Sequence, residues 1–280
     1  TITVTAVNDA PVASAVSAST NEDTAKAITL SATDVEGSSL TYSIVSNPSN
    51  GSLGSVSGSG VTYTPNTNWN GTDTFTYKAN DGTADSNIST VTITVAAVND
   101  APTTSAVNVS TNEDTAKAIT LSGADTEGSS LTYSIVSNPS NGSVGSVSGS
   151  GVTYTPNTNW NGTDTFTYKA NDGTADSNIS TVTITVAAVN DAPVANDVSG
   201  STNENRSMQL NITLDATDID GDALTYSIVS DVSNGSTSIS GSTLTYTPDS
   251  NWNGTDTFSY KANDGSLNSN TATGTITVTA

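Results

Sequence analysis

Acidic side chains recur at nearly fixed spacing in this sequence, and they carry its most evident chemistry. Asp34 is followed by Asp125 after 91 positions and by Asp218 after 93 more. Each stands shortly before an alternating, strand-like segment, where a turn is expected. Carboxylate oxygens are the ligands that Ca²⁺ takes in six- to eightfold number. Their type and spacing therefore predict cation binding at turns.

The composition lacks the side chains that most catalytic sites use. The chain of 280 residues has 27 acidic and 6 basic side chains, no histidine and no cysteine. No motif pairs a nucleophile with a base, and zinc or copper would lack their usual ligands. We therefore expect a protein that is not an enzyme.

The formal net charge of −21 argues against nucleic acid and anionic membrane surfaces as partners, and no apolar run is long enough for direct membrane insertion.

The segment Val-Asn-Asp-Ala-Pro occurs three times, at residues 7–11, 98–102 and 189–193. Such a fixed period, of about 90 residues, is the signature of a repeat array. Proline disfavours helix in the residue before it and removes an amide donor, so these segments suit stiff connectors. We name the Asn-Asp pairs 8–9, 99–100 and 190–191 the first, second and third junctions.

The period divides the chain into three domains. Thr1–Thr5 alternate like a strand, so residues 1–9 are expected to hold the last strand of a preceding repeat and its linker. The repeats then span residues 10–98, 101–189 and 192–280, separated by the junctions 99–100 and 190–191. The first two repeats differ at 8 of 89 aligned positions, which suits a chain whose useful property is its length.

Each repeat shows about seven short alternating segments with turn signals between them. This pattern is typical of an Ig-like β-sandwich of about 100 residues. We expect an all-β chain of three tandem Ig-like, cadherin-like sandwiches in an end-to-end array. The expected strands of the first repeat are Val12–Ser19, Ala25–Leu30, Leu40–Ile44, Ser52–Ser57, Val61–Pro65, Asp73–Lys78 and Thr90–Ala96.

Antiparallel strands place successive loops at opposite ends of a sandwich, and this gathers the acids. In the first repeat Asp34, Glu36 and Asp81 fall at the end nearest the first junction, whereas Glu22 and Asp73 fall at the other end. Five or more carboxylates would then meet at one junction, a density of charge that needs a cation. The candidate metal ligands are Asn8, Asp9, Asp34, Glu36, Asp81, Glu22, Asp73, Asn99, Asp100, Asp125, Glu127, Asp172, Glu113, Asp164, Asn190, Asp191, Asp218, Asp220 and Asp264.

These acids have other readings as well. The acidic excess alone would keep an extracellular protein soluble. Asp73 fits a turn-capping role as well as it fits ligation, and Asn-Asp-Gly around Asp81 is also an ordinary turn. Trp69 is expected to pack as a structural residue beneath the turn that precedes the strand-like segment 73–78. The alternative is that its ring stacks on a sugar.

Two motif groups resemble the cadherin repeat. Residues 216–221, Ala-Thr-Asp-Ile-Asp-Gly, and the strand-like segment 224–228 resemble its Ala-Thr-Asp-x-Asp motif and the strand after it. Asn171-Asp172-Gly173, the segment 181–186 and the third junction resemble its final loop, strand and linker. The family's first-strand glutamate is matched by Glu22, Glu113 and Glu204.

The likeness is closer still to the cadherin-like tandem repeats of large bacterial surface proteins and adhesins, whose units carry Asn-Glu-Asp, Tyr-Thr-Pro, Trp-Asn-Gly and Val-Asn-Asp-Ala-Pro. The resemblance implies an extracellular stalk, made rigid by Ca²⁺ at its junctions, for adhesion or biofilm. The cadherin Asp-Arg-Glu motif is missing here, and Glu36 and Glu127 replace the second Asp of Asp-x-Asp. We therefore expect one or two ions at each junction.

The expected function is that of a spacer segment on the cell surface, whose partners are the neighbouring repeats of the same chain. One alternative is a module that binds a carbohydrate or a receptor through its loops. Another is a subunit of an extracellular filament, in which identical chains pair through Thr-rich edge strands. The near-identity of the first two repeats favours the spacer.

Overall fold

The structure is a computed structural model that describes residues 1–5, 7–204 and 209–280. The described residues form strands and turns and contain no helix, so none that could cross a membrane. They separate into two compact units. The first comprises Thr1–Ser105, Ser122–Ser134 and Lys169–Ser180, and the second comprises Ala106–Leu121, Ile135–Tyr168 and Thr181–Ala280. The first and second junctions lie in the first unit, and the third junction lies in the second.

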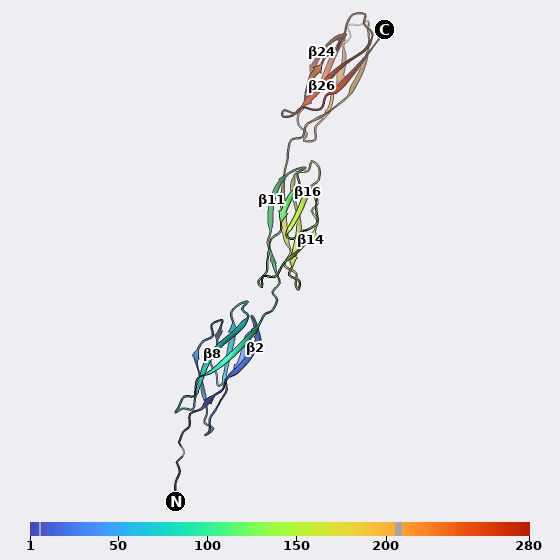
Figure 1. The fold of residues 1–280 in the computed structure, drawn as a ribbon. Coiled ribbons are helices and arrows are strands. Elements are labelled where there is room, and N and C mark those ends of the chain that lie inside the picture. Colours follow the sequence, from blue (N-terminus) through green and yellow to red (C-terminus); the bar gives the residue numbers. More distant parts are fainter. Residues whose placement is uncertain (6, 205–208) are drawn as a thin grey trace. The chain divides into compact units, whose positions relative to one another are not determined.

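In the part of the chain that the structure describes, each repeat has nine strands. Figure 1 shows the three repeats as separate sets of strands. Those of the first are β1 (Val12–Ala13), β2 (Val16–Asn21), β3 (Lys26–Thr29), β4 (Ala32–Thr33), β5 (Thr41–Ser46), β6 (Gly51–Leu53), β7 (Gly60–Pro65), β8 (Gly71–Asn80) and β9 (Ser89–Ala96). Those of the second are β10 (Thr103–Thr104), β11 (Val107–Asn112), β12 (Lys117–Thr120), β13 (Gly123–Ala124), β14 (Thr132–Ser137), β15 (Gly142–Val144), β16 (Gly151–Pro156), β17 (Gly162–Asn171) and β18 (Ser180–Ala187). Those of the third are β19 (Val194–Asn196), β20 (Val198–Asn203), β21 (Leu210–Thr213), β22 (Asp215–Thr217), β23 (Thr225–Ser230), β24 (Gly235–Ser240), β25 (Thr243–Pro248), β26 (Gly254–Asn263) and β27 (Ala272–Thr279).

Each repeat pairs its strands in the same order. In the first repeat the sheets are β2-β9-β8-β5, β3-β7-β6 and the short pair β1-β4. Strands β2 and β9 run parallel, with Val16 opposite Val91, while the other pairs are antiparallel. The third repeat follows the same order as β20-β27-β26-β23, β21-β25-β24 and β19-β22. The expected all-β class with three tandem Ig-like sandwiches is confirmed.

The core follows from strict alternation along the long strands. In β8, Phe75, Tyr77 and Ala79 are buried, while Thr72 and Thr74 before them are exposed and Thr76 and Lys78 between them are half-buried. Phe75 and Tyr77 pack in one cluster with Ile93 of β9, which is also fully buried. Burying a side chain of this size stabilises a fold by about 1.5–3 kcal/mol. Two apolar faces of this kind hold each sandwich together without disulfides.

The first strand of each repeat is divided between two sheets, which corrects the single strand expected over Val12–Ser19. Ala13 pairs with Ala32 in β4, whereas Val16 begins the parallel pairing with β9. The side chain of Asn87 accepts a hydrogen bond from Ala13 N (2.9 Å) and donates one to Ala13 O (3.0 Å). The Asn87 side chain thus makes the backbone hydrogen bonds that a neighbouring strand would otherwise make to Ala13. The alternation of apolar and polar residues in the sequence does not reveal such a replacement.

Thr1–Thr5 are exposed and form no strand, contrary to the alternation of their sequence. Their pattern is that of a strand, but among the described residues no other strand pairs with them. Strand geometry is stable in water when neighbouring strands satisfy its backbone groups, so the pattern by itself does not produce one.

Candidate cation-binding site at the junctions

The third junction is held by two loops of the third repeat. The loop after β26 contributes Asp264, whose Oδ2 accepts a hydrogen bond from Asn190 Nδ2 at 2.9 Å. The loop after β22 contributes Asp220, whose Oδ2 accepts from Asp191 N at 2.8 Å. Two acidic side chains that lie far from the junction in sequence therefore fix it, Asp264 through the Asn190 side chain and Asp220 through the Asp191 backbone.

The first and second junctions repeat this arrangement. Asn8 Nδ2 donates to Asp81 Oδ2 at 2.9 Å, and Asn99 Nδ2 donates to Asp172 Oδ2 at 2.8 Å. Glutamate replaces Asp220 in these loops and accepts the backbone bond at a longer distance. Asp9 N lies 3.4 Å from Glu36 Oε2, and Asp100 N lies 3.2 Å from Glu127 Oε2.

The loop aspartates that bond the junction asparagines are kept ionised. The pKa of Asp81 is lowered first by the hydrogen bond from the backbone of Ala84, then by Asn8 and by the backbone of Thr83. Asp172 and Asp264 have lowered pKa values for the same reasons. Bonds to the charged form of a carboxylate favour that form, so each junction carries a fixed negative charge.

A second group of aspartates has a carboxylate oxygen that is buried and without a hydrogen-bond partner in the described part of the chain. In two of them the other carboxylate oxygen accepts a hydrogen bond: Ser38 N donates to Asp34 Oδ1 at 2.8 Å, and Ser129 N donates to Asp125 Oδ1 at 2.7 Å. A buried charged oxygen that lacks a donor is costly, by more than about 1–3 kcal/mol. The unpartnered atoms are Oδ2 of Asp34, Asp100, Asp125 and Asp218.

The buried glutamates Glu22 and Glu113 lie at the other side of the second and third junctions. Glu22 is 4% exposed, and its Oε1 accepts a bond of 2.5 Å from Val98 N, directly before the second junction. Its own backbone N–H donates to Ala96 O. Glu113 accepts the corresponding bond from Val189 N. These two side chains therefore fix the chain as it leaves β9 and β18.

Asp73 and Asp164 have the hydrogen-bond environment of turn-capping residues, which is one of the two roles expected for Asp73. Asp73 is 4% exposed, and four donors surround it: the backbone N–H groups of Ser49, Asn50 and Thr74, and the Tyr63 hydroxyl at 3.0 Å. Burial first, and then the bond to Asp73, raise the pKa of Tyr63. Asp164 has the same set of bonds. Because their oxygens are already saturated with donors, we leave both out of the proposed ligands.

Asp191 stands among four further carboxylates. Its pKa is raised, first by desolvation and then by repulsion from Asp220, Asp114, Glu113 and Asp218. Glu113 and Asp114 come from the turn after β11 of the second repeat, and Asp218 and Asp220 come from the loop after β22 of the third. Their mutual repulsion disfavours the charged form of Asp191, which is the electrostatic signature of a site that a cation would stabilise.

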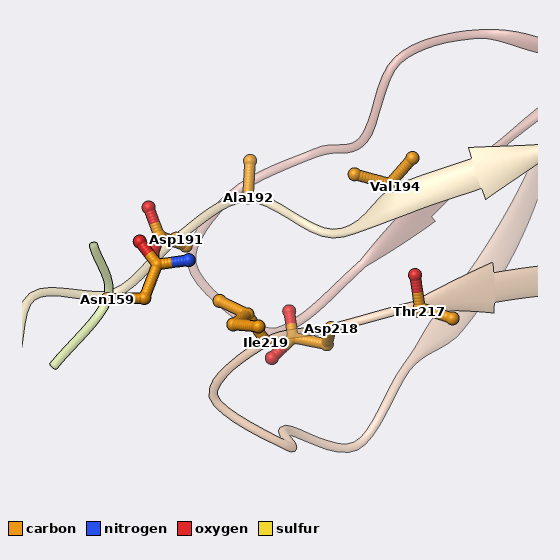
Figure 2. A pocket seen from close by; sticks show the side chains of 7 residues that line it. All are labelled: Asn159, Asp191, Ala192, Val194, Thr217, Asp218 and Ile219. Atoms are coloured by element: carbon orange, nitrogen blue, oxygen red, sulfur yellow. The ribbon is translucent and has the colours of Figure 1, made fainter. Parts of the chain in front are cut away.

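Two residues at this junction are missing from the sequence-based set. Asp114 follows Glu113, and Asn159 precedes Trp160 in the turn between β16 and β17. Asn159 N donates to Asp114 Oδ1 at 3.0 Å, and both residues have a positive φ, of 54° for Asp114 and 52° for Asn159. The recurrence of Asn-Glu-Asp and Asn-Trp-Asn in the first two repeats is the signal that could have found them. Figure 2 shows Asn159 beside Asp191, in a hollow that Ala192, Val194, Thr217, Asp218 and Ile219 also line.

The described carboxylates do not by themselves complete a metal site. No group of three or more carboxylates in the described ranges is arranged so that it could hold a metal ion. Amide and carbonyl oxygens must therefore contribute to any Ca²⁺ site here, which suits the mixed oxygen ligands that Ca²⁺ accepts. The buried unpartnered oxygens would supply the carboxylate part of such a mixed set.

Comparison with known proteins gives both distant and family-level matches. A curated relative, the integrin beta-like protein A of Dictyostelium discoideum, is 30% identical over 267 residues, covering 79% of this chain and 14% of the relative. The chain thus spans a small part of that relative's length.

The matched structures include the human desmocollin-1 ectodomain, at 16% identity and a TM-score of 0.42 over 96% of this chain and 61% of that one. An I-band fragment of titin matches at 13% identity and a TM-score of 0.37 over 98% of this chain and all of the fragment. An endo-fucoidan hydrolase of glycoside hydrolase family 107 matches at 20% identity and a TM-score of 0.30, over 98% of this chain and 45% of the hydrolase. At such scores these matches carry no argument about function.

The bacterial Ig domain family model matches three times, at residues 8–94, 99–185 and 190–279. Each match begins at the asparagine of one junction, and together they cover most of the chain. The chain therefore belongs to the bacterial Ig domain family.

Proposed function

We propose that this chain is a structural spacer segment of an extracellular, adhesin-type surface protein, and that Ca²⁺ bound at its junctions makes the connections between repeats rigid. The observation that carries the proposal is the set of buried, unpartnered carboxylate oxygens at Asp34, Asp100, Asp125 and Asp218. Tandem bacterial Ig-like domains and the integrin beta-like relative support a role in adhesion or structure at the cell surface.

The physical argument rests on uncompensated charge. The junctions lie in a chain with a formal net charge of −21 and 6 basic side chains. Two of the basic side chains, Lys78 and Lys169, form ion pairs with Asp85 and Asp176, which are not among the proposed ligands. A divalent cation would offset repulsion that the side chains leave unbalanced. It would also satisfy oxygens that no hydrogen-bond donor reaches.

The proposed ligands are the junction residues and the loop acids that face them. Asp81, Asp172 and Asp264 would also orient the junction asparagines, because they already bond the asparagine amides. Glu22 and Glu113 would act from the opposite side through their second oxygen. The remaining members are Asn8, Asp9, Asp34, Glu36, Asn99, Asp100, Asp125, Glu127, Asn190, Asp191, Asp218 and Asp220.

The proposal predicts that shape and stability depend on calcium. Small-angle X-ray scattering should show a stiffer, more extended particle with about 1 mM Ca²⁺ than with a chelator. When the free Ca²⁺ concentration is about a hundredfold above the Kd of a site, binding stabilises the folded state by about 2.7 kcal/mol. The melting temperature should rise by several degrees, which is the shift expected for a gain of this size.

Matched variants locate the effect. Asp125→Asn and Asp218→Asn keep the shape of the side chain and the bond accepted by Oδ1, and remove the charge from the buried oxygen. Each should reduce the calcium response, while Asp231→Asn, in a turn of the third repeat, should not. If calcium changes neither scattering nor melting of the unsubstituted chain, the proposal fails and the acids serve solubility.

A further inference from the structure

The short strand pair that opens each repeat is the place where the first two repeats differ most. In the first repeat it consists of Val12–Ala13 (β1) and Ala32–Thr33 (β4), and in the second of Thr103–Thr104 (β10) and Gly123–Ala124 (β13). All four positions differ, so this pair holds half of the 8 differences among the 89 aligned positions. Each change on one strand is thus accompanied by a change on the strand that faces it.

The third repeat carries the pair of the first repeat and not that of its neighbour. Val194 faces Thr217, and Ala195 faces Ala216, which are the residue types of the first repeat. Over the rest of its length the second repeat is far more similar to the first than the third is. The type of pair therefore alternates along the chain, and no two neighbouring repeats share it. Common descent alone would instead give the two most similar repeats the same pair.

The facing residues are matched in size within each repeat. Ala13 is 5% exposed and faces Ala32, whereas Thr104 is 7% exposed and faces Gly123. The larger buried side chain of the second repeat thus stands opposite a residue without a side chain. An added Cβ at Gly123 would lie 3.1 Å from Cδ1 of Leu131, which is closer than side chains normally approach, so β13 cannot carry the alanine of β4 without displacing a neighbour.

Thr104 also makes a polar contact that alanine cannot replace. Its hydroxyl donates to Asn178 O at 2.8 Å and lies 2.9 Å from Oγ of the buried Ser180. The hydrogen bonds to the backbone of the first strand, in contrast, are common to both repeats: the Asn178 side chain bonds Thr104 N and O just as the Asn87 side chain bonds Ala13 N and O. These backbone bonds accept either first strand, so discrimination between the two strands falls to the facing residues.

We propose that the first strand pair is a recognition element, through which each repeat binds its own first strand and excludes the first strand of a neighbouring repeat. Near-identical repeats in one chain are liable to exchange strands as they fold, within a chain or between two copies of it. Thr104 placed opposite Ala32 would crowd a buried position, and Ala13 placed opposite Gly123 would leave a gap and remove a partner of Ser180. Such selection acts while the repeats fold and needs no cation.

Engineered disulfides can report which first strand a repeat holds, because the chain has no cysteine of its own. Directly beside the pair, Ser14 N donates to Ser31 O at 2.9 Å in the first repeat, and Ser105 N donates to Ser122 O at 3.2 Å in the second. Cysteines at facing strand positions of this kind lie within reach of a disulfide. The variant Ser14→Cys with Ser31→Cys therefore reports correct pairing, and Ser31→Cys with Ser105→Cys reports exchange.

The decisive variant gives the second repeat the pair of its neighbours through Thr103→Val, Thr104→Ala, Gly123→Ala and Ala124→Thr. It should fold, because the first repeat holds the same pair among the same surrounding residue types. The full chain with the exchange reporter would be refolded from denaturant in chelator, under oxidising conditions and at several protein concentrations. The cross-linked fraction should rise about tenfold in this variant, because crowding no longer opposes the exchanged strand. Cross-linked dimers mark exchange between chains, and cross-linked monomers mark exchange within one chain.

The matched control is Val144→Leu, which also makes the first two repeats more alike, but in β15. It should leave the cross-linked fraction unchanged. In thermal melts, Thr104→Ala and Gly123→Ala should each lower the melting temperature, while the double variant should recover most of the loss because alanine then faces alanine. An unchanged cross-linked fraction in the fourfold variant, an equal rise with Val144→Leu, or additive losses in the melts would overturn the inference.

Discussion

Two aspartates of the first repeat, Asp73 and Asp34, show how differently one sequence uses the same side chain. Asp73 is enclosed by four hydrogen-bond donors, which hold the turn before β6 against β7 and β8. Asp34 accepts one bond from Ser38 N, and its other oxygen is buried without a partner. Both lie next to turns and both recur in the later repeats.

The difference separates a structural carboxylate from a proposed ligand. A carboxylate with all its lone pairs occupied gains nothing from a cation, and its loss disrupts the fold under any condition. A carboxylate with an unpartnered buried oxygen is costly until a cation arrives. The calcium dependence of each substitution should therefore distinguish the two groups.

The largest effect is expected for Asp73→Asn. The substituted amide nitrogen would face N–H and O–H donors, so buried groups would lose their partner and stability should fall by about 3–5 kcal/mol. Chemical denaturation should show the same loss with calcium and with chelator. A loss that calcium restores would place Asp73 among the ligands after all.

A smaller but still large effect is expected for Gly51→Ala, in the turn that Asp73 holds. A Cβ at this position would lie 2.5 Å from a ring carbon of Tyr63 and 2.6 Å from Thr64 O. Such overpacking costs about 1–3 kcal/mol, again without dependence on calcium. Gly54→Ala, whose Cβ would meet its nearest neighbour at 3.8 Å, is the matched control for the same denaturation experiment.

Asp34→Asn should behave in the opposite way. In chelator it should leave stability unchanged or raise it slightly, because it removes a buried charge that has no partner. With calcium the variant should melt at a lower temperature than the unsubstituted chain, because it loses up to about 2.7 kcal/mol of the stabilisation that calcium binding supplies. The same difference from the unsubstituted chain with calcium and with chelator would contradict the assignment of Asp34.

The smallest effect is expected for Asp85→Asn, which removes the exposed ion pair with Lys78. Hydrogen bonds from Lys78 and then Asn80 lower the pKa of Asp85. A lowered pKa means that the pair stabilises the fold above the ordinary carboxyl pKa, and that this contribution is lost as the pH falls through the folded value. Melting near neutral pH should therefore change slightly, and the difference should vanish in acid, with or without calcium.

Much of the fold could be predicted because strand alternation and turn residues act locally. The pattern of Phe75 and Tyr77 gave the correct inward face of β8, and the 91-residue period gave the three sandwiches. The division of the first strand could not be predicted, because it depends on Asn87, which lies 74 positions from Ala13 and replaces a strand partner with a side chain.

The candidate site was predictable to the level of loops and not to the level of atoms. Antiparallel order places Asp81 and Glu36 near the first junction, and the structure shows their bonds to Asn8 and Asp9. The same reasoning could not tell that donors would saturate Asp73, because Tyr63 and the backbone of Asn50 meet it only in the folded sandwich.

The most direct test of the central claim is a calcium titration of the chelator-treated full chain by calorimetry, with the Asp34→Asn, Asp125→Asn, Asp218→Asn triple variant as control. Saturable binding is expected, with one or two ions at each junction and most of the heat absent in the triple variant. No binding to the unsubstituted chain, or the same binding in both proteins, would contradict the account.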